Sequence, residues 1–150
     1  MTFLLDTMVW VWLCQRPDII PERVLDSLRK TDERWGLSAV SPWEVARKVS
    51  LFNKKPGHPA ALNLGLPFSE WFEKAWDEAD YSILPLTPQI AAESNNLPGR
   101  FHHDPMDQII IATARRHDLT LVTSDRLIKA YPHVRKLCFT PKSEPENRNH

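Results

Sequence analysis

The sequence is poor in the features that mark several common classes of protein. Its two cysteines, Cys14 and Cys138, lie far apart and lack metal-ligand spacing, which favours small core residues in a reduced cytoplasmic chain over a disulfide scaffold. The formal net charge is +0, from 19 basic and 19 acidic residues, so any contact with nucleic acid must be local rather than that of a polycation. The 4 glycines are scattered, which excludes a phosphate-cradling glycine motif.

Long hydrophobic runs are also missing. The longest apolar run near the N-terminus, residues 8–14, is too short to span a bilayer, and Asp6 separates it from the apolar residues before it. No basic region precedes this run, so it does not resemble a signal peptide, and we expect a cytoplasmic protein. A length of 150 residues suits one domain, which we expect at residues 1–140, followed by a polar tail at residues 141–150.

Short apolar stretches alternate with stretches of helical character along the chain. The candidate strands lie at residues 3–6, 35–40, 81–86, 119–123 and 134–139. The candidate helices lie at about 21–30, 41–52, 68–79, 88–97, 108–115 and 125–131, with a helical turn through Trp10 and Trp12. This alternation predicts a three-layer α/β/α domain with a mainly parallel sheet of roughly five strands.

Five carboxylates lie where expected strands give way to expected helices. They are Asp6, Glu44, Asp104, Asp107 and Asp125. In an open parallel sheet the carboxyl ends of the strands gather along one edge, so residues distant in sequence meet there. Like charges in one crevice either take up protons or bind a divalent metal, and oxygen ligands favour Mg²⁺ or Mn²⁺.

Helix capping is a second explanation for most of these acids, because carboxylates at helix N-termini are stabilised by the helix dipole. Ser41 is the expected N-cap of its helix and forms a capping box with Glu44. Asp104 and Asp107 form a close variant of the same motif, and Asp125 also fits an N-cap position. Position alone therefore does not assign any of these four acids to a metal.

Asp6 differs from the others. It follows an apolar strand and precedes an apolar run, so we expect it to be at least partly buried. A buried carboxylate without a partner is costly, and the first basic residue after it is Arg16. Its partner must come from elsewhere in the fold or from a metal, which favours a functional site over separate caps.

Other notable residues have ordinary interpretations. The loop histidines His102 and His103 lack a His-x-x-x-His or Cys-x-x-Cys partner, so we interpret them as solvated residues rather than zinc ligands. The aromatic residues within 68–76 fit core packing, and the alternative is an exposed patch that binds a partner. Basic clusters favour solvated helix faces, although any on the acidic rim would hold phosphates. These clusters lie at residues 47–48, 54–55 and 115–117.

Four segments together resemble the pattern of PIN-domain ribonucleases, and especially the toxin subunits of bacterial VapBC toxin–antitoxin pairs. They are Phe3-Leu-Leu-Asp6-Thr7, Ser41-Pro42-Trp43-Glu44, the segment from His103-Asp-Pro-Met-Asp107 through Ala114, and Leu121-Val-Thr-Ser-Asp125. Their order and spacing extend the resemblance over nearly the whole domain. Gln108 departs from the pattern, where many relatives carry Arg, as does Met8, where many carry His or Asn.

The resemblance implies a PIN-like fold with an acidic site that binds Mg²⁺ or Mn²⁺. Its metal-binding and catalytic residues would be Asp6, Glu44, Asp107 and Asp125, with Asp104 as an additional acid and Thr7 and Ser124 in support. It also implies a homodimer and a cognate VapB-type antitoxin. The antitoxin would lay a segment across the aromatic groove and block the acidic site, often with an arginine.

These observations predict metal-assisted hydrolysis of RNA phosphodiester bonds by the toxin of a type II toxin–antitoxin system. Two other interpretations stay open: a housekeeping PIN-domain nuclease without an antitoxin, and a weakly catalytic module whose acidic cluster binds basic protein segments. An acidic α/β phosphatase is more distant, because the segment after Asp6 lacks a second aspartate two residues on.

Overall fold

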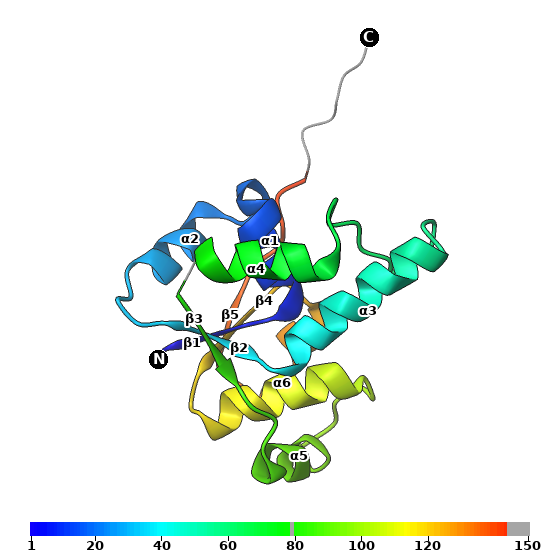
Figure 1. Cartoon of the computed structure of the whole chain (residues 1–150). Helices are drawn as coiled ribbons and strands as arrows, with labels where there is room; N and C mark the ends of the chain where they lie inside the picture. The colour runs from blue at the N-terminus through cyan, green and yellow to red at the C-terminus, as the bar shows by residue number, and fades with distance from the viewer. Residues whose placement is uncertain (79, 144–150) are drawn as a thin grey trace.

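The computed structural model describes residues 1–78 and 80–143 and is built on a five-stranded sheet (Figure 1). The strands are β1 (Phe3–Leu5), β2 (Trp35–Ser38), β3 (Tyr81–Leu84), β4 (Thr120–Thr123) and β5 (Lys136–Cys138). They lie in the order β3-β2-β1-β4-β5, and every neighbouring pair is parallel. The predicted α/β fold with a five-stranded parallel sheet is confirmed, although each strand is shorter than its apolar stretch.

Helices connect the strands. They are α1 (Thr7–Gln15), the short 3-10 helix η1 (Pro17–Ile19), α2 (Glu22–Arg29), α3 (Val40–Lys54), α4 (Phe68–Glu78), α5 (Pro88–Ser94), α6 (Pro105–Arg116) and α7 (Arg126–Ala130). The segment around Trp10 forms the full helix α1, where the sequence predicts only a turn. Val9, Trp10 and Val11 are all buried, so this helix lacks the one-sided apolar stripe that reveals a surface helix in a sequence.

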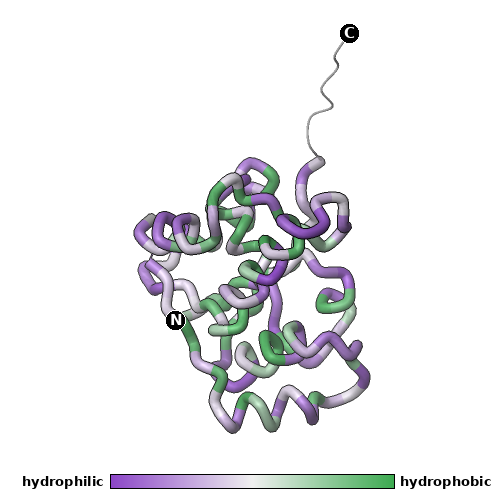
Figure 2. The backbone as a smooth tube through the Cα atoms, turned by 45° about the vertical axis from the view of Figure 1, so that its right-hand side comes forward, coloured by the Kyte–Doolittle hydropathy of each residue, from purple (hydrophilic) through white to green (hydrophobic). Residues whose placement is uncertain are grey.

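The sheet separates two hydrophobic cores, one on each face. Leu5 and Val122 belong to the core that includes residues of α1, α2, α3 and α4, whereas Leu4 and Leu121 belong to the core beneath α6 and α7. Successive strand residues point to opposite faces, which explains this division. Figure 1 shows α1, α2 and α4 on one side of the sheet and α5 and α6 on the other, and Figure 2 shows hydrophobic and hydrophilic residues alternating along the helices.

The aromatic residues of α4 pack into the first core. Trp71 is buried, and its ring meets the ring of Trp10 edge-on, with the centroids 5.2 Å apart. Phe68, Phe72 and Trp76 are half-buried and pack against the same core. These contacts support the core interpretation of the aromatic stripe.

Helix α3 begins earlier than its sequence suggests. Its N-cap is Ala39, and no side chain caps it, so the predicted capping roles of Ser41 and Glu44 are wrong. Ser41 is fully buried, and its hydroxyl contacts Thr7 instead. Pro42 then falls in the first turn, where its missing N–H leaves no hydrogen bond unmade.

Two further features concern the edge of the sheet and the C-terminal end of the described chain. Strand β3 lies at the edge of the sheet and ends at Leu84, before Pro85, as the proline predicts. The backbone N–H of Lys142 donates to the carbonyl of Ile19 at 2.7 Å, so the chain contacts the domain beyond residue 140, while residues 144–150 of the expected tail lie outside the described residues.

Two further observations concern cysteines and membranes. Cys14 and Cys138 are both half-buried rather than enclosed in the core. Among the described residues, no helix combines the length and apolar character needed to cross a membrane.

Candidate metal centre

The predicted acids meet at one crevice of the sheet. Strand β1 lies between β2 and β4, and the crevice beyond the carboxyl ends of the strands at such a switch point is where α/β domains bind ligands. Asp6 follows β1, Asp125 follows β4, and α3 and α6 supply Glu44 and Asp107. A cavity of about 220 Å³ opens there. Its lining includes every residue of the predicted site, namely Asp6, Thr7, Glu44, Asp104, Asp107, Ser124 and Asp125.

Asp6 is buried, with 9% of its surface exposed, and it is also the N-cap of α1. This corrects the expectation that capping does not explain Asp6: its Oδ1 accepts the N–H of Thr7 at 2.8 Å. Its Oδ2 accepts the hydroxyl of Thr123 at 2.6 Å. Burial raises the pKa of Asp6 to about 6, the two hydrogen bonds oppose this rise, and the charges of Glu44 and Asp125 add to it.

Asp107 has the higher pKa of the two site acids whose pKa is raised. Burial raises the pKa of Asp107 to about 8, and the negative charges of Asp6, Asp104 and Asp125 raise it further. At neutral pH the metal-free carboxyl group is therefore mostly protonated. A pKa so far above that of an ordinary aspartate marks a group whose ionised form a bound cation would stabilise.

Glu44 is held by contacts with α1 and with its own helix. The hydroxyl of Thr7 donates to Glu44 Oε2 at 2.8 Å and lies 2.9 Å from the hydroxyl of Ser41. Because the single proton of Thr7 goes to the carboxylate, Ser41 must donate to Thr7. Lys48 Nζ, one turn further along α3, lies 3.3 Å from Glu44 Oε1. Thr7 thus contacts two of the predicted acids.

Asp125 and Asp104 are N-caps, of α7 and α6. Asp125 Oδ1 accepts the N–H groups of Leu127 and Ile128 at 2.9 and 3.0 Å. Asp104 Oδ1 accepts the N–H of Met106 at 2.9 Å, and the residue is exposed. The capping explanation is correct for both acids, but the caps engage only Oδ1 in each case. Capping therefore does not exclude metal binding.

His102 contributes to the site in a way that its sequence does not reveal. It is half-buried rather than solvated. Its Nε2 lies 3.1 Å from Asp107 Oδ2, but the angle is not that of a hydrogen bond, and Nε2 forms no hydrogen bond with any described residue. Its Nδ1 accepts the N–H of Asp104 at 3.3 Å. In the neutral ring this places the proton on Nε2, so His102 faces Asp107 as a donor rather than as a lone-pair ligand.

Thr123, and Lys48 from the basic cluster at residues 47–48, also contact acids of the site. The spacing of Lys48 from Glu44 is i, i+4, a pairing that a sequence can reveal. Thr123 gives no such signal, because only the pairing of β4 with β1 brings it to Asp6. Its hydroxyl also accepts the N–H of Asp125 at 3.0 Å, so it joins two acids of the site.

The donor set fits a divalent cation. Ligand atoms of Asp107 and Asp125 lie within 4.8 Å of one another, close enough to share one ion, and Asp6 and Glu44 line the same cavity. Carboxylate oxygens predominate, which suits hard divalent ions. The acidic crevice is therefore a candidate metal site.

The fold and the site define the class of this protein: it is an α/β domain with a parallel sheet and an acidic site at the switch point of that sheet. The chain is a member of the PIN domain family, which it matches over residues 3–134. This confirms the resemblance inferred from the four sequence segments.

Two kinds of relative are similar to the chain. Ribonuclease VapC22 of Mycobacterium tuberculosis (strain ATCC 25618 / H37Rv) is 28% identical over 134 residues, which are 89% of this chain and 95% of that protein. The DNA-bound VapBC structure from Salmonella typhimurium matches with a TM-score of 0.66 and 16% identity, over 92% of this chain and 98% of that chain. VapBC2 from Rickettsia felis, bound to a DNA fragment from its promoter, also has a TM-score of 0.66 and 16% identity, over 93% and 99%.

Proposed function

We propose that this protein is a metal-dependent ribonuclease that hydrolyses RNA phosphodiester bonds as the toxin of a type II toxin–antitoxin pair. The observation that carries the proposal is the meeting of Asp6, Glu44, Asp107 and Asp125 at one cavity, with the pKa values of Asp6 and Asp107 raised. Membership of the PIN domain family and similarity to a protein named ribonuclease VapC22 support RNA as the substrate. The VapBC complexes among its structural neighbours support the toxin role.

The acids of the cavity would have different roles in binding the metal. Asp6, Asp107 and Asp125 would bind it directly, Glu44 would bind it directly or through water, and Asp104 would add negative charge at the rim. A bound divalent cation supplies an activated water and offsets the negative charge that develops on the phosphate. Oxygen donors favour Mg²⁺ or Mn²⁺ as that cation.

Neighbouring side chains orient the acids before substrate arrives. Thr123 and the N–H of Thr7 fix both oxygens of Asp6. The hydroxyl of Thr7 and the ammonium of Lys48 fix the two oxygens of Glu44. Such hydrogen bonds keep carboxylates in place when a metal site forms, so these residues serve as positioning residues.

The proposed toxin role implies a protein partner, an oligomeric state and a cellular location. A VapB-type antitoxin would cover the acidic site in the resting complex, and the toxin would act as a homodimer in the cytoplasm, where its RNA substrate is found. We assign the nuclease domain to residues 1–140. Copurification with a small protein encoded by the adjacent gene tests the antitoxin, and a lone gene without such a partner favours a housekeeping PIN-domain nuclease.

A cleavage assay on tRNA, rRNA and mRNA tests the central proposal. We expect cleavage with Mg²⁺ or Mn²⁺, none in EDTA, and none by Asp6→Asn or Asp107→Asn at any metal concentration. Asp32→Asn is the matched control, since this acid is exposed and lies outside the cavity, and it keeps wild-type activity. Thermal unfolding curves show that the inactive variants are folded. Cleavage that persists in EDTA, or in the Asp107→Asn protein, contradicts the assignment.

A further inference from the structure

A second and larger depression lies beside the acidic cavity. This depression, the α3 groove, has a volume of about 650 Å³ and runs between α3, the loop at residues 58–60 and the first turn of α6. Glu44, Lys48 and Asp104 line both the groove and the acidic cavity. A ligand in the groove would therefore reach the acids without leaving the surface.

The side chains of the α3 groove are cationic away from the cavity. Arg47 and Lys54 are exposed, and within residues 1–78 and 80–143 neither forms an ion pair. They lie seven positions apart along α3, which is two helical turns, so they fall on one face about 10 Å from each other. Two unneutralised cations in line with an acidic metal site are complementary to a chain of phosphates.

Trp43 adds an aromatic surface to the same face, one turn before Arg47. Its side chain is 53% exposed. Among the large hydrophobic residues that are exposed in the described part of the chain, Trp43 is the only aromatic one. The guanidinium carbon of Arg47 lies 5.4 Å from the centre of the Trp43 ring. An exposed ring beside a cation binds an unpaired base by stacking, whereas bases inside a duplex are already stacked on one another.

From these observations we propose that the α3 groove binds the single-stranded RNA substrate next to the cleavage site. Arg47 and Lys54 contact its phosphates, and Trp43 stacks on a base. The proposal rests on the proposed ribonuclease function, because it assigns the groove to that substrate. It adds that the enzyme selects unpaired RNA through residues that do not touch the metal.

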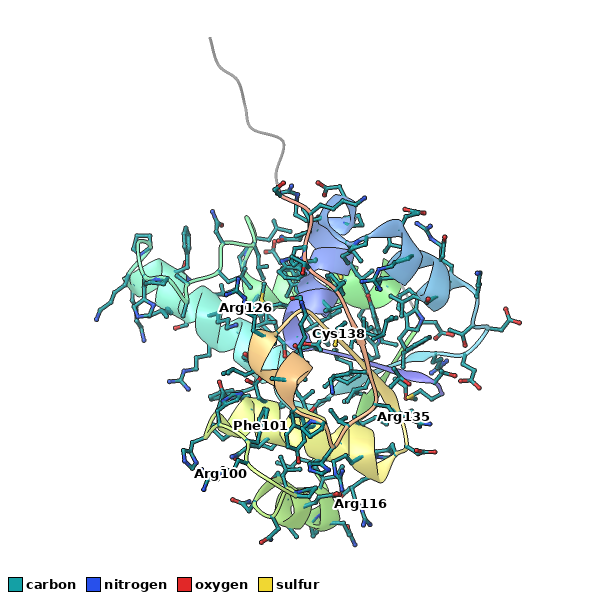
Figure 3. All side chains as sticks on the ribbon, turned by 180° about the vertical axis from the view of Figure 1, so that it is seen from behind. Arg100, Phe101, Arg116, Arg126, Arg135 and Cys138 are labelled. Carbon is teal, nitrogen blue, oxygen red and sulfur yellow. The ribbon has the colours of Figure 1, made fainter. Side chains whose placement is uncertain are left out.

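Another basic depression is a weaker candidate. It lies at the far end of α6 and includes Arg115, Arg116 and Arg135; Figure 3 shows Arg116 and Arg135 well away from α3. Two of its three arginines form close ion pairs, since Arg115 pairs with Glu93 at 2.9 Å and Arg135 pairs with Asp118 at 2.7 Å. A basic protein segment is likewise a poor occupant of the α3 groove, because Arg47 and Lys54 would repel it.

Fluorescence anisotropy in EDTA tests the proposal apart from catalysis. The probe is a fluorescein-labelled, single-stranded oligoribonucleotide of mixed sequence, titrated with the full chain at several salt concentrations. Each phosphate contact contributes about 0.7 to the slope of log affinity against log salt for a single strand, so the double variant Arg47→Gln/Lys54→Gln should lose about 1.4. Trp43→Ala should weaken binding roughly tenfold, and Trp43→Phe should restore part of the loss.

Arg116→Gln/Arg135→Gln is the matched control, because it removes the same charge from an exposed surface elsewhere. We expect it to keep the wild-type slope and affinity, and we expect the labelled strand to bind more tightly than the same strand in a duplex. The proposal is overturned if the groove variants bind RNA like the wild type, if the control loses as much as they do, or if the duplex binds equally well. Groove variants that keep RNA affinity but lose a copurifying protein assign the groove to that partner instead. Cutting of the strand in EDTA, seen on a gel, contradicts the proposed metal dependence and leaves the binding result intact.

Discussion

Metal binding at the acidic cavity should compete with protons over a defined range of pH. In the metal-free protein the pKa of Asp6 is raised to about 6 and that of Asp107 to about 8, chiefly by burial. A metal binds ionised carboxylates, so a protonated ligand must first lose its proton. The apparent affinity then falls tenfold for each pH unit below the pKa of each ligand. With these two values it should rise about 100-fold from pH 6 to pH 8 and level off above pH 8.

Calorimetric titration with Mn²⁺ in buffers of different ionisation enthalpy measures both the affinity and the protons released. At pH 7 we expect about one proton per ion, because Asp107 is then mostly protonated and Asp6 mostly ionised. Asp107→Asn should bind more weakly and lose the pH dependence between 7 and 8, while the dependence near pH 6 remains. Asp32→Asn should keep the wild-type profile. A wild-type affinity that is constant from pH 6 to pH 8 refutes the reasoning, whatever its absolute value.

The same groups should govern the stability of the fold. An unfolded aspartate has a pKa of about 3.9, and burial raises the pKa values of Asp6 and Asp107 above it. Their stabilising effect is therefore complete below about pH 4 and is lost as pH rises through about 6 and 8. Urea denaturation in EDTA should show a free energy of unfolding that falls as pH rises over this range. A free energy of unfolding that rises instead would contradict the burial of these acids. Thr123→Val removes the hydroxyl that binds ionised Asp6, so we expect a loss of about 1.5–3 kcal/mol at pH 7 by the same method; an unchanged denaturation midpoint would show that this hydrogen bond contributes nothing.

The sheet and the acidic edge are predictable from the sequence because their signals are local. Leu4 and Leu5 form a short apolar run that ends at Asp6, and Leu121 and Val122 form another that ends just before Asp125. Each run is too short for a helix and is bounded by polar residues, which favours a strand, and the rule that parallel strands end at one edge brings the acids together. That is why the predicted acids line one cavity although they are distant in sequence.

The parts that the sequence does not predict depend on contacts made after folding. Ser41 is a residue type that favours a helix N-cap, yet α3 starts at Val40 and the hydroxyl of Ser41 is buried against Thr7. Thr123 reaches Asp6 only through strand pairing. His102 lies in a loop without periodicity, so nothing in the sequence relates it to the acids. Local propensity places the elements, whereas these hydrogen bonds are decided by tertiary packing.

Substrate binding and metal binding place opposite demands on the surface around α3. The acidic cavity repels the phosphates of RNA until a cation is bound, because its ionised carboxylates carry the same sign of charge. The cationic end of the α3 groove has no such requirement, because Arg47 and Lys54 attract phosphates without a bound metal. RNA affinity in EDTA should therefore report the groove, and proton release on adding Mn²⁺ should report the cavity. Since Trp43 and Glu44 both line the groove, a strand held there already lies beside the acids when the metal arrives.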